Sequence, residues 1–481
     1  MAVPQLPWKA PVAMLRLNAM LPPFDPWHTA MTAFDVASSS KAGPADLARM
    51  RAQRLVVLLE AARRAPMFEA LIGARDPATI HLQDLPITNK AMLMANFAGW
   101  VTDPELKLDE MCRFVADPTR IGEAYLGRYL LWESSGSTGG SGLFVQDARS
   151  LAVYDALEAI RRPVPRPFEP WLQPWRWLDE RTAFVVATNG HFASTLSVER
   201  LRQLNPLLAR TLCCVPFLQP LAQLSAQLMG IAPQILATYP SVAVMLAEEQ
   251  LDGRLELHLR EVWTGGETLT DAMRATIAHA FHCDVVNNYG ASEFMSLASE
   301  CAHHQLHLNS DWAILEPVDD KGLPVPPGVM SATTLLTNLA NHVQPIIRYD
   351  LGDRVTVHAD PCTCGSHLPV IEVHGRSGDL IRLPGAQAGE DTRVSGLALS
   401  TVLETVEALS DFQLIQHAPD RLELRTELSG PGTGKMLRQA RSVLETYLRS
   451  QGAADVHIAC HSNCPSLRSR NGKVQRVMAM P

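Results

Sequence analysis

Hydroxyl side chains and glycines fill one short stretch of the chain. Ser134–Gly142 reads Ser-Ser-Gly-Ser-Thr-Gly-Gly-Ser-Gly and follows Tyr129–Trp132, an apolar run that predicts a buried strand. Glycine lets the backbone approach a ligand closely, and successive N–H groups and hydroxyls can donate to phosphate oxygens. A flexible linker has the same composition. Taken alone, this stretch leaves both a phosphate-binding loop and a linker open.

A second stretch combines an aromatic ring, a glycine and a carboxylate. Asn287–Glu293 reads Asn-Asn-Tyr-Gly-Ala-Ser-Glu and directly follows Cys283–Val286, which is typical of a strand. Open α/β sheets bind ligands beyond the carboxyl ends of their parallel strands. There a ring could stack on a base, and a carboxylate could hold Mg²⁺ beside phosphates. A capped turn explains the same residues, so this stretch alone does not decide either.

Further stretches place glycine beside charged side chains. Each is commonplace alone, but their order and spacing together are not. They are Trp263–Glu267, Arg348–Asp353, His374–Asp379 and Arg470–Arg476. Another segment, Ser429–Lys435, looks like a nucleoside-triphosphate loop. It has Ser429 where that motif needs glycine and Met436 where it needs a hydroxyl, so we expect a turn there.

The length, composition and net charge of the chain limit the classes of protein to which it could belong. At 481 residues it is too long for one core, and we expect two or three domains. The hydrophobic share of 47% is ordinary for a globular protein, and the apolar runs are too short to span a membrane. A net charge of −8 without a block of lysine or arginine argues against nucleic acid as the main partner. We find no signal peptide, and nine scattered cysteines are typical of reduced thiols, so we expect a cytoplasmic protein.

Periodicity predicts an α/β fold. From residue 129 to 350, short apolar strands alternate with helical stretches, which indicates α/β layers around a mostly parallel sheet. Expected strands there are 183–188, 235–238, 261–264 and 285–288. Beyond residue 335 we expect antiparallel strands at 345–349, 354–358 and 370–374, then a compact α+β unit with a hairpin (412–417 and 422–426), a helix (436–449) and a returning strand (456–460). Helical periodicity runs from 46 to 71, ending near Pro66, and a helix restarts with Thr88 or Asn89 as its N-cap.

Together the motifs resemble those of the adenylate-forming (AMP-forming) acyl-ligase superfamily, and most of all its phenylacetate–CoA ligase branch. The matching segments are Leu85–Lys90 (L-P-x-T-K), Ser134–Gly139 (S-S-G-[ST]-T-G), Tyr289–Glu293 (Y-G-x-[ST]-E), Arg348–Asp353 (R-Y-x-x-G and the following Asp), Gly375–Asp379 (G-R-[ST]-x-D) and Gly472-Lys473 (G-K). The resemblance covers about residues 45–481 in order. It turns Ser134–Gly139 from an open question into an expected phosphate loop.

The resemblance implies a division into domains. We expect a large multi-layer adenylation domain at 45–377, with parallel-rich sheets and a small β region. A small mobile α+β lid domain would follow at 378–481, and residues 1–44 would form an arm of uncertain structure.

The family joins a carboxylic acid to ATP, giving an acyl-adenylate and pyrophosphate, and then passes the acyl group to a thiol, commonly that of coenzyme A. By resemblance, Glu293 would bind Mg²⁺, Asp353 the ribose, and Tyr289 would flank the adenine. Arg376 would lie near the ribose and phosphates. The remaining ATP-binding positions are Ser134, Ser135, Gly136, Ser137, Thr138, Gly139, Gly266, Glu267, Asn288, Gly290 and Ser292.

Two residues are candidates for catalysis. Lys473 would reach the substrate carboxylate and the α-phosphate, offsetting charge in the adenylation transition state. Without the resemblance it would read as an exposed lysine near a C-terminus. His191 follows Thr188-Asn189-Gly190, where relatives place a loop between substrate and nucleotide, and a turn histidine explains it equally well.

The chain departs from its relatives at two positions. The hinge position, usually Asp or Lys, is Gly378, and glycine permits the large φ/ψ change of a domain rotation. The phosphate loop continues as Gly139–Gly142 where relatives often have Lys-Pro, which removes a basic residue. That loss leaves room for altered phosphate binding or a degenerate enzyme.

Cysteines and histidines predict a structural zinc site. Cys301, His307, Cys362 and Cys364 form a Cys₃His set, and some members of the branch carry a similar pattern. His303, His304 and His367 compete for the histidine position. The spacing of Cys362 and Cys364 is unusual for zinc, so free reduced thiols are the alternative.

We therefore expect an acyl-CoA ligase for an aromatic or other small apolar acid, bound between the His191 loop, Tyr239 and the region 265–289. Its ligands would be the acid, ATP, Mg²⁺ and CoA, with structural Zn²⁺, and we allow for a homodimer. An amide synthetase or a carrier-protein acyl ligase is the alternative. An inactive binding relative fits less well, because Glu293, Asp353, Arg376 and Lys473 are all retained.

Overall fold

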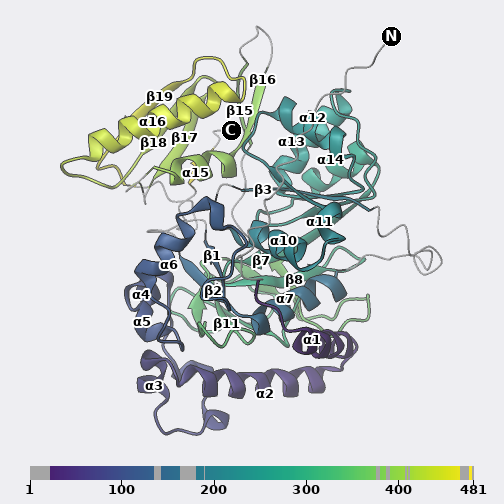
Figure 1. Cartoon of the computed structure of the whole chain (residues 1–481), viewed down its shortest axis with the longest axis vertical. Coiled ribbons are helices and arrows are strands. Elements are labelled where there is room, and N and C mark those ends of the chain that lie inside the picture. The colour runs from purple at the N-terminus through teal and green to yellow at the C-terminus, as the bar shows by residue number, and fades with distance from the viewer. Residues whose placement is uncertain are drawn as a thin grey trace.

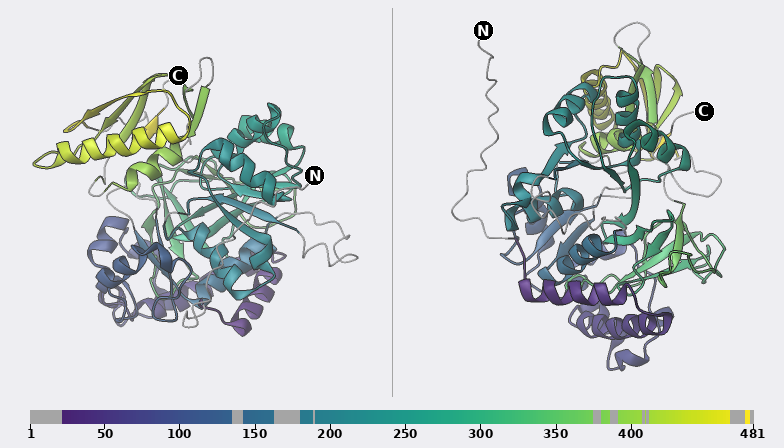
Figure 2. Two further views of the ribbon diagram at one scale, coloured as in Figure 1. Left: turned by 45° about the horizontal axis from the view of Figure 1, so that its top comes forward. Right: turned by 90° about the vertical axis from the view of Figure 1, so that its right-hand side faces the viewer.

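A computed structural model describes residues 22–134, 142–162, 180–188, 190–374, 380–385, 391–406, 409, 412–465 and 476–478. A large N-terminal unit carries a smaller C-terminal one, coloured yellow-green, at one end (Figures 1 and 2). Several predicted site residues lie outside the described residues: Ser135, Gly136, Ser137, Thr138, Gly139, Arg376, Gly378 and Lys473. Among the described helices, none is both long and apolar enough to cross a bilayer.

A nine-stranded sheet forms the centre of the large unit, in the order β13-β14-β9-β8-β7-β6-β5-β3-β4. The parallel strands are β3 (Thr182–Val186), β4 (Leu212–Pro216), β5 (Ile235–Thr238), β6 (Glu261–Thr264) and β7 (Asp284–Ala291). The antiparallel strands are β8 (Phe294–Glu300), β9 (Leu306–Leu308), β13 (Val355–Val357) and β14 (Val370–Val373). The expected parallel core is present, and β7 is the strand at which the sheet changes from parallel to antiparallel.

Helices cover both faces of the parallel strands, as is usual for parallel sheets. α12 (Leu221–Ile231), α13 (Pro240–Leu251) and α14 (Asp271–Phe281) lie on one side, and α10 (Ala193–Leu204) and α11 (Leu208–Thr211) on the other (Figure 1). Ala183 and Val185 of β3 pack with Leu246 of α13 and Ile277 of α14 in one core. The central residues of these strands are mostly apolar because both faces of the sheet are covered.

Smaller sheets adjoin the central one. β1 (Leu130–Glu133) and β2 (Leu143–Gln146) form an antiparallel hairpin, and β10 (Ala313–Val318), β11 (Thr333–Asn338) and β12 (Tyr349–Asp350) form a three-stranded sheet. α7 (Ala148–Ile160) follows the hairpin and begins at Asp147, whose side chain accepts from Ser150 N. Trp132, Tyr154 and Phe294 join these elements in a second core.

Of the N-terminal helices, α1, α2 and α3 lie in the lower part of Figure 1, and α4, α5 and α6 lie at its left. They are α1 (Pro26–Ser39), α2 (Pro44–Ala62), α3 (Pro66–Ile72), α4 (Lys90–Ala95), α5 (Phe97–Trp100) and α6 (Leu108–Val115), with 3-10 turns at Pro77–Thr79, Leu82–Asp84 and Pro118–Arg120. α1 packs against α7, so residues 26–39 of the expected arm form a helix on the core. Asn89 caps α4 as expected, because its side chain accepts from Met92 N at 3.0 Å.

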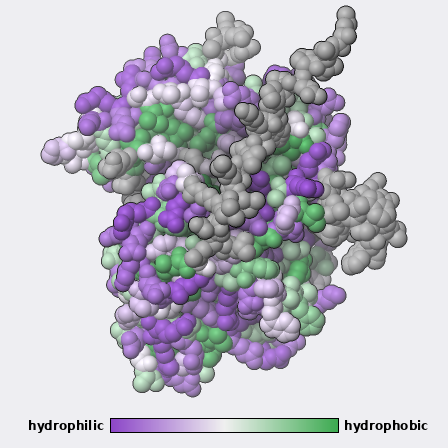
Figure 3. Space-filling model, in the orientation of Figure 1, coloured by the Kyte–Doolittle hydropathy of each residue, from purple (hydrophilic) through white to green (hydrophobic). Residues whose placement is uncertain are grey.

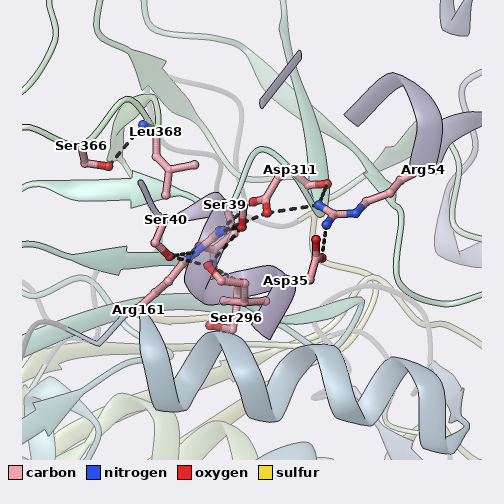
Figure 4. Close-up of polar contacts among 11 residues, drawn as sticks. Asp35, Ser39, Ser40, Arg54, Arg161, Ser296, Asp311, Ser366 and Leu368 are labelled. Carbon is pink, nitrogen blue, oxygen red and sulfur yellow. Dashed lines mark hydrogen bonds and ion pairs between the residues drawn. The ribbon is translucent and has the colours of Figure 1, made fainter. Parts of the chain in front are cut away.

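A buried ion network fixes these helices to the sheets (Figure 4). Asp311, fully buried between β9 and β10, accepts from Arg161 through both carboxylate oxygens, at 2.7 and 2.8 Å. Arg54 of α2 also reaches Asp311, at 3.1 Å, and pairs with Asp35 of α1. Burial would raise the pKa of Asp311, but the guanidinium groups of Arg161 and Arg54 hold it below the usual range.

The C-terminal unit is an α+β structure, as expected. Its elements are β15 (Leu380–Pro384), β16 (Asp391–Ser395), α15 (Gly396–Glu404), β17 (Gln413–Ala418), β18 (Arg421–Arg425), α16 (Thr433–Ser450), β19 (His457–His461) and β20 (Val477–Met478). The expected hairpin, helix and returning strand correspond to β17–β18, α16 and β19, and Ser429–Lys435 is a turn that enters α16. Arg393 pairs with Glu248 of α13 at 2.7 Å, which joins the unit to the large one.

One expected strand is wrong in its extent. Pro345–Tyr349 was expected to be extended and paired, yet only Tyr349 and Asp350 join a ladder, as β12. Side chains form the hydrogen bonds of the backbone just before these two residues: Trp100 Nε1 donates to Pro345 O at 2.6 Å, and Arg348 N donates to Thr337 Oγ1 at 3.0 Å.

On the face in Figure 3, hydrophilic and hydrophobic residues are interspersed, as on an ordinary protein surface.

Candidate active site

One large cavity lies where the parallel strands end. It has a volume of about 1280 Å³. Its lining includes the segment after β6, the end of β7 and the turn that follows it, the segment after β12, and Ser134 at the start of the loop between β1 and β2. Every residue predicted to bind ATP or Mg²⁺ within the described part of the chain lines it: Ser134, Gly266, Glu267, Asn288, Tyr289, Gly290, Ser292, Glu293 and Asp353. Segments more than 200 residues apart in sequence therefore meet around a single space.

Two glycines permit the close backbone packing of the cavity wall. Gly266 has a φ of +80°, which L side chains rarely adopt, and a Cβ there would lie 3.1 Å from the Tyr239 ring. A Cβ on Gly290 would lie 1.9 Å from the carbonyl oxygen of Met295 on the neighbouring strand β8. The turn from β7 to β8, which carries Ser292 and Glu293, therefore depends on glycine at position 290.

The expected phosphate loop joins β1 to β2. Ser134 N donates to Gly142 O at 2.8 Å, and Gly142 N donates to Ser134 Oγ at 2.8 Å, which closes the base of the loop. Residues 135–141 between them lie outside the described residues. Trp132 of β1 donates from Nε1 to Ser292 O at 2.9 Å. This bond ties the loop's base to the β7–β8 turn.

Glu293 presents a buried carboxylate to the cavity. Its residue is only 9% exposed, and burial raises the pKa of the carboxyl, while a hydrogen bond from the Tyr349 hydroxyl and the charge of Lys90 oppose that rise. Asn338 holds the Glu293 backbone by donating to its carbonyl at 2.8 Å. A carboxylate that lines the cavity suits a hard divalent cation such as Mg²⁺.

Tyr289 and Asp353 lie next to each other in the lining of the cavity. The Tyr289 hydroxyl donates to Asp353 Oδ2 at 2.9 Å, and burial next to this carboxylate raises the pKa of the phenol well above its usual value. The predicted adenine and ribose contacts thus come from one hydrogen-bonded pair.

Glu267 serves the adjacent helix as well as the cavity. Its carboxylate accepts from Ser241 N and from Ser241 Oγ, both at 3.0 Å, at the start of α13. Ser241 Oγ in turn lies 2.9 Å from Ser395 Oγ of the C-terminal unit. Burial raises the pKa of Glu267, and the two bonds from Ser241 oppose this. Glu267 therefore connects the cavity edge to the contact between the two units.

His191 lies away from the cavity lining. Its residue is 1% exposed, its ring packs against Phe114 with centroids 5.8 Å apart, and Nε2 is 3.4 Å from Asp117 O. Burial lowers the pKa of the imidazole. Its backbone carbonyl accepts from Glu133 N at 2.8 Å, directly before the loop. In this arrangement the backbone of His191 supports the hairpin, and a catalytic role for its ring stays a prediction.

The four predicted zinc ligands come together. One ligand atom from each of Cys301, His307, Cys362 and Cys364 lies within 4.8 Å of the others. Cys301 Sγ is 3.8 Å from Cys362 Sγ, and Cys364 Sγ is 3.4 Å from His307 Nε2. Thiolate and imidazole ligands in this number suit tetrahedral Zn²⁺.

The orientation of His307 fits metal binding. Its Nδ1 lies 2.9 Å from Leu368 O, and because a carbonyl can only accept, Nδ1 carries the proton. Nε2, which faces the sulfur atoms, is then left with its lone pair, as in many metal sites. The competing His304 instead lies 3.2 Å from Arg274 through Nδ1, and His303 contacts Thr363.

Two residues of the cavity that sequence reasoning did not single out lie close to Glu293. Lys90 lines the cavity beside Ser134 and Glu293, and Tyr349 donates to Glu293. Both lie inside motifs that the sequence displays, the segments 85–90 and 348–353. The sequence motifs alone do not show that these two segments lie in contact in the folded protein.

Comparisons with known proteins agree with this architecture. No model of a known protein family matches the chain. It is 28% identical over 211 residues to phenylacetate–coenzyme A ligase of Thermus thermophilus, covering 41% of this chain and 46% of the relative. It is 27% identical over 195 residues to protein CapK of Staphylococcus aureus, covering 40% and 41% of the two chains. The alignments thus span less than half the length of these curated relatives.

Solved structures extend the likeness to nearly the whole chain. The structure of 2-hydroxyisobutyryl-CoA ligase with 2-HIB-AMP and CoA in its thioesterification state matches 92% of this chain and 91% of its own, with a TM-score of 0.57 and 18% identity. The same ligase in its postadenylation state matches with a TM-score of 0.53 and 18% identity. The chain has the α/β fold of adenylate-forming CoA ligases, and the resemblance to their phenylacetate–CoA ligase branch, expected from the motifs, is confirmed.

Proposed function

We propose that the protein activates a carboxylic acid with ATP to an acyl-adenylate and transfers the acyl group to coenzyme A, releasing AMP. The observation that carries this proposal is the convergence of Ser134, Tyr289, Glu293 and Asp353 on one cavity at the carboxyl ends of parallel strands. That is where open α/β sheets bind nucleotides. The likeness to CoA ligases in sequence and fold supports the same reaction.

Each step would use groups that are positioned before the substrates arrive. Tyr289 and Asp353 would hold adenine and ribose, and the loop that starts at Ser134 would donate to the phosphates. Glu293 would hold Mg²⁺, which supplies charge neutralisation at the phosphates. Lys473, outside the described residues, would balance the negative charge that develops between the acid's carboxylate and the α-phosphate.

We propose an aromatic or other small apolar acid as the substrate. The Tyr239 ring lies against Gly266 at the cavity edge and makes an edge-to-face contact with Phe217, with centroids 5.2 Å apart. Neither ring lines the cavity itself, but aromatic rings directly behind Gly266 would favour a flat apolar acid through ring packing if the acid binds at this edge.

The alternative is an adenylating enzyme that delivers its acyl group to an amine or to a carrier-protein thiol. Its adenylation half-reaction would use the same residues, so the acceptor alone separates the two hypotheses. A binding relative without turnover would have kept this residue set without using it.

A pyrophosphate-release assay tests the proposal. Aromatic, heteroaromatic and short fatty acids are screened with ATP and Mg²⁺, in the presence of CoA or of amines. We expect acid-dependent release with consumption of CoA. Release that needs an amine would favour the alternative, and no release with any acid would reject adenylation. Glu293→Gln is the matched inactive control.

We also propose that the Cys301, His307, Cys362 and Cys364 cluster holds structural Zn²⁺. The cluster pins the turn after β8 and the strand β9 to the segment before β14. With four protein ligands the site has no open position, which is typical of structural rather than catalytic zinc.

A further inference from the structure

The most exposed aromatic side chains among the described residues lie on one helix, α1. Trp27 is 77% exposed and Phe34 is 72% exposed, more than any other large hydrophobic side chain in that part of the chain. Phe24 and Met31, which are also exposed, precede them by three residues each. Single exposed apolar side chains are ordinary, but a contiguous group of them is typical of a surface that a partner covers.

The opposite face of α1 fixes the helix to the large unit. α1 packs against α7, and Val36 is fully buried in the core there. Arg161 donates to Ser39 Oγ at 2.7 Å and to Ser40 Oγ at 3.2 Å, at the end of the helix (Figure 4). The exposed face of α1 is therefore held in place before any partner binds.

This exposed face carries no charge. Apart from Trp27 and Phe34, the exposed residues of the helix are Pro26, Ala30, Met31, Ala37 and Ser38. The outer face of a surface helix usually carries charged and polar side chains. A two-fold axis would bring this face against the same face of a second copy, and no like charges would meet. The absence of charge therefore fits a second copy of the chain as the partner.

Large and small residues alternate along the middle of this face. Trp27, Ala30, Phe34 and Ala37 follow one another at spacings of three, four and three residues, as in the seam of a helix pair. Two such helices can run antiparallel about a two-fold axis at the level of Thr32. Trp27 then lies opposite the partner's Ala37. Ala30 lies opposite the partner's Phe34, so a large side chain meets a small one in every layer, as close packing requires.

The exposed apolar area is sufficient for a specific interface. Because an aromatic side chain buries about 150–250 Å², the exposed parts of Phe24, Trp27 and Phe34 together with Met31 amount to roughly 500 Å² per copy. Two copies would then bury about 1000 Å², which reaches the lower limit of specific protein interfaces.

We propose that α1 is a dimerisation surface, covered by the α1 helix of a second copy of this chain in an antiparallel, two-fold symmetric pairing. No residue of α1 belongs to the described lining of the candidate active site. The inference therefore does not depend on the reaction that the protein catalyses.

Sedimentation velocity of the full chain, diluted through the micromolar range, tests the pairing. We expect a wild-type dimer. Trp27→Glu should raise its dissociation constant about a hundredfold or more, because the two-fold axis repeats the loss of a central aromatic side chain. Leu323→Glu is the matched control, since Leu323 is an exposed leucine outside α1, and it should leave the dimer unchanged. Thermal unfolding checks that each variant folds.

A size swap tests the register of the two helices. Ala30→Phe alone places two large side chains opposite each other, and Phe34→Ala alone places two small ones there. Each single variant should weaken the dimer about tenfold or more. The double variant Ala30→Phe/Phe34→Ala restores one large and one small residue in each layer, so it should recover most of the wild-type affinity. Failure of the double variant to recover would overturn the antiparallel pairing.

Two other results would overturn the proposal. One is a dimer that Trp27→Glu leaves intact, because another surface would then form it. The other is a wild-type protein that stays monomeric. If that monomer sedimented with vesicles of phosphatidylcholine and phosphatidylglycerol and Trp27→Glu did not, the exposed face of α1 would be a membrane-binding surface instead.

Discussion

The Tyr289 hydroxyl and the Asp353 carboxylate form a hydrogen bond of 2.9 Å, although 64 residues separate them in the sequence. Tyr289 lies near the carboxyl end of β7, where this strand pairs antiparallel with β8, and Asp353 follows β12. The bond holds the two groups expected to contact adenine and ribose in a fixed relation before nucleotide binds.

The first prediction concerns this pair. Asp353→Asn removes the charge that would accept from the ribose hydroxyls, and we expect it to weaken binding of ATP and AMP equally, by about tenfold. Tyr289→Phe keeps the ring and removes only the hydroxyl, so its effect should be smaller. Calorimetry with both nucleotides measures this. A loss confined to ATP would place Asp353 at the phosphates instead.

The second prediction concerns Gly290. Gly290→Ala places a methyl group 1.9 Å from Met295 O, so the β7–β8 turn must shift. We expect a loss of about 1–3 kcal/mol in the free energy of unfolding, with weaker binding of ATP.

Gly230→Ala is the control for Gly290→Ala. Gly230 lies in α12, is exposed and has nothing within 4 Å of a built Cβ, so alanine there should stabilise the protein by up to about 1 kcal/mol. Urea unfolding compares the two variants. Equal stability of both would show that the turn at Gly290 tolerates a side chain.

Strands buried on both faces could be predicted from the sequence. The expected strands 235–238 and 261–264 agree with β5 and β6 residue for residue, because short apolar runs bounded by turns leave little choice. The irregular segment before Tyr349 could not be predicted. Its hydrogen-bond partners, such as Trp100 and Thr337, come from distant parts of the chain, and periodicity carries no information about them.

In the candidate site, too, some features could be predicted from the sequence and others could not. Motif order predicted which residues would face the nucleotide, and the described ones line one cavity. The sequence could not predict the orientation of a single side chain. His191 follows the expected loop, yet its ring packs against Phe114. The place of Lys90 in the cavity lining depends on the pairing of Thr88 with β12, which a linear pattern does not display.

The third prediction concerns the metal. Purified wild-type protein should contain close to one zinc per chain, and a content below about 0.2 would reject the site, because structural zinc binds tightly. Cys364→Ser should lower the zinc content and the melting temperature, since it removes one of four ligands.

Cys112→Ser is the control for Cys364→Ser, because Cys112 is an exposed cysteine outside the cluster. Elemental analysis and thermal unfolding provide readouts that do not depend on enzyme activity. If both serine variants kept the wild-type zinc content, the metal would be bound elsewhere or adventitiously.

The fourth prediction concerns the buried pair of Arg161 and Asp311. Asp311→Asn leaves the Arg161 charge buried without its counterion, and we expect a loss of about 3–5 kcal/mol in the free energy of unfolding. Asp46→Asn removes an exposed partner of Arg49, 2.8 Å away, and should cost less than about 1 kcal/mol.

The pH dependence of stability separates the charge of Asp311 from its packing. The folded state lowers the pKa of Asp311, so its contribution is complete above its unfolded pKa of about 4 and is lost as pH falls through the lower folded value. The difference in unfolding free energy between wild type and Asp311→Asn should therefore be constant from pH 5 to 7 and shrink below about pH 4. Urea unfolding at several pH values measures it, and a difference that stayed constant below pH 4 would mean that packing, rather than charge, accounts for the effect.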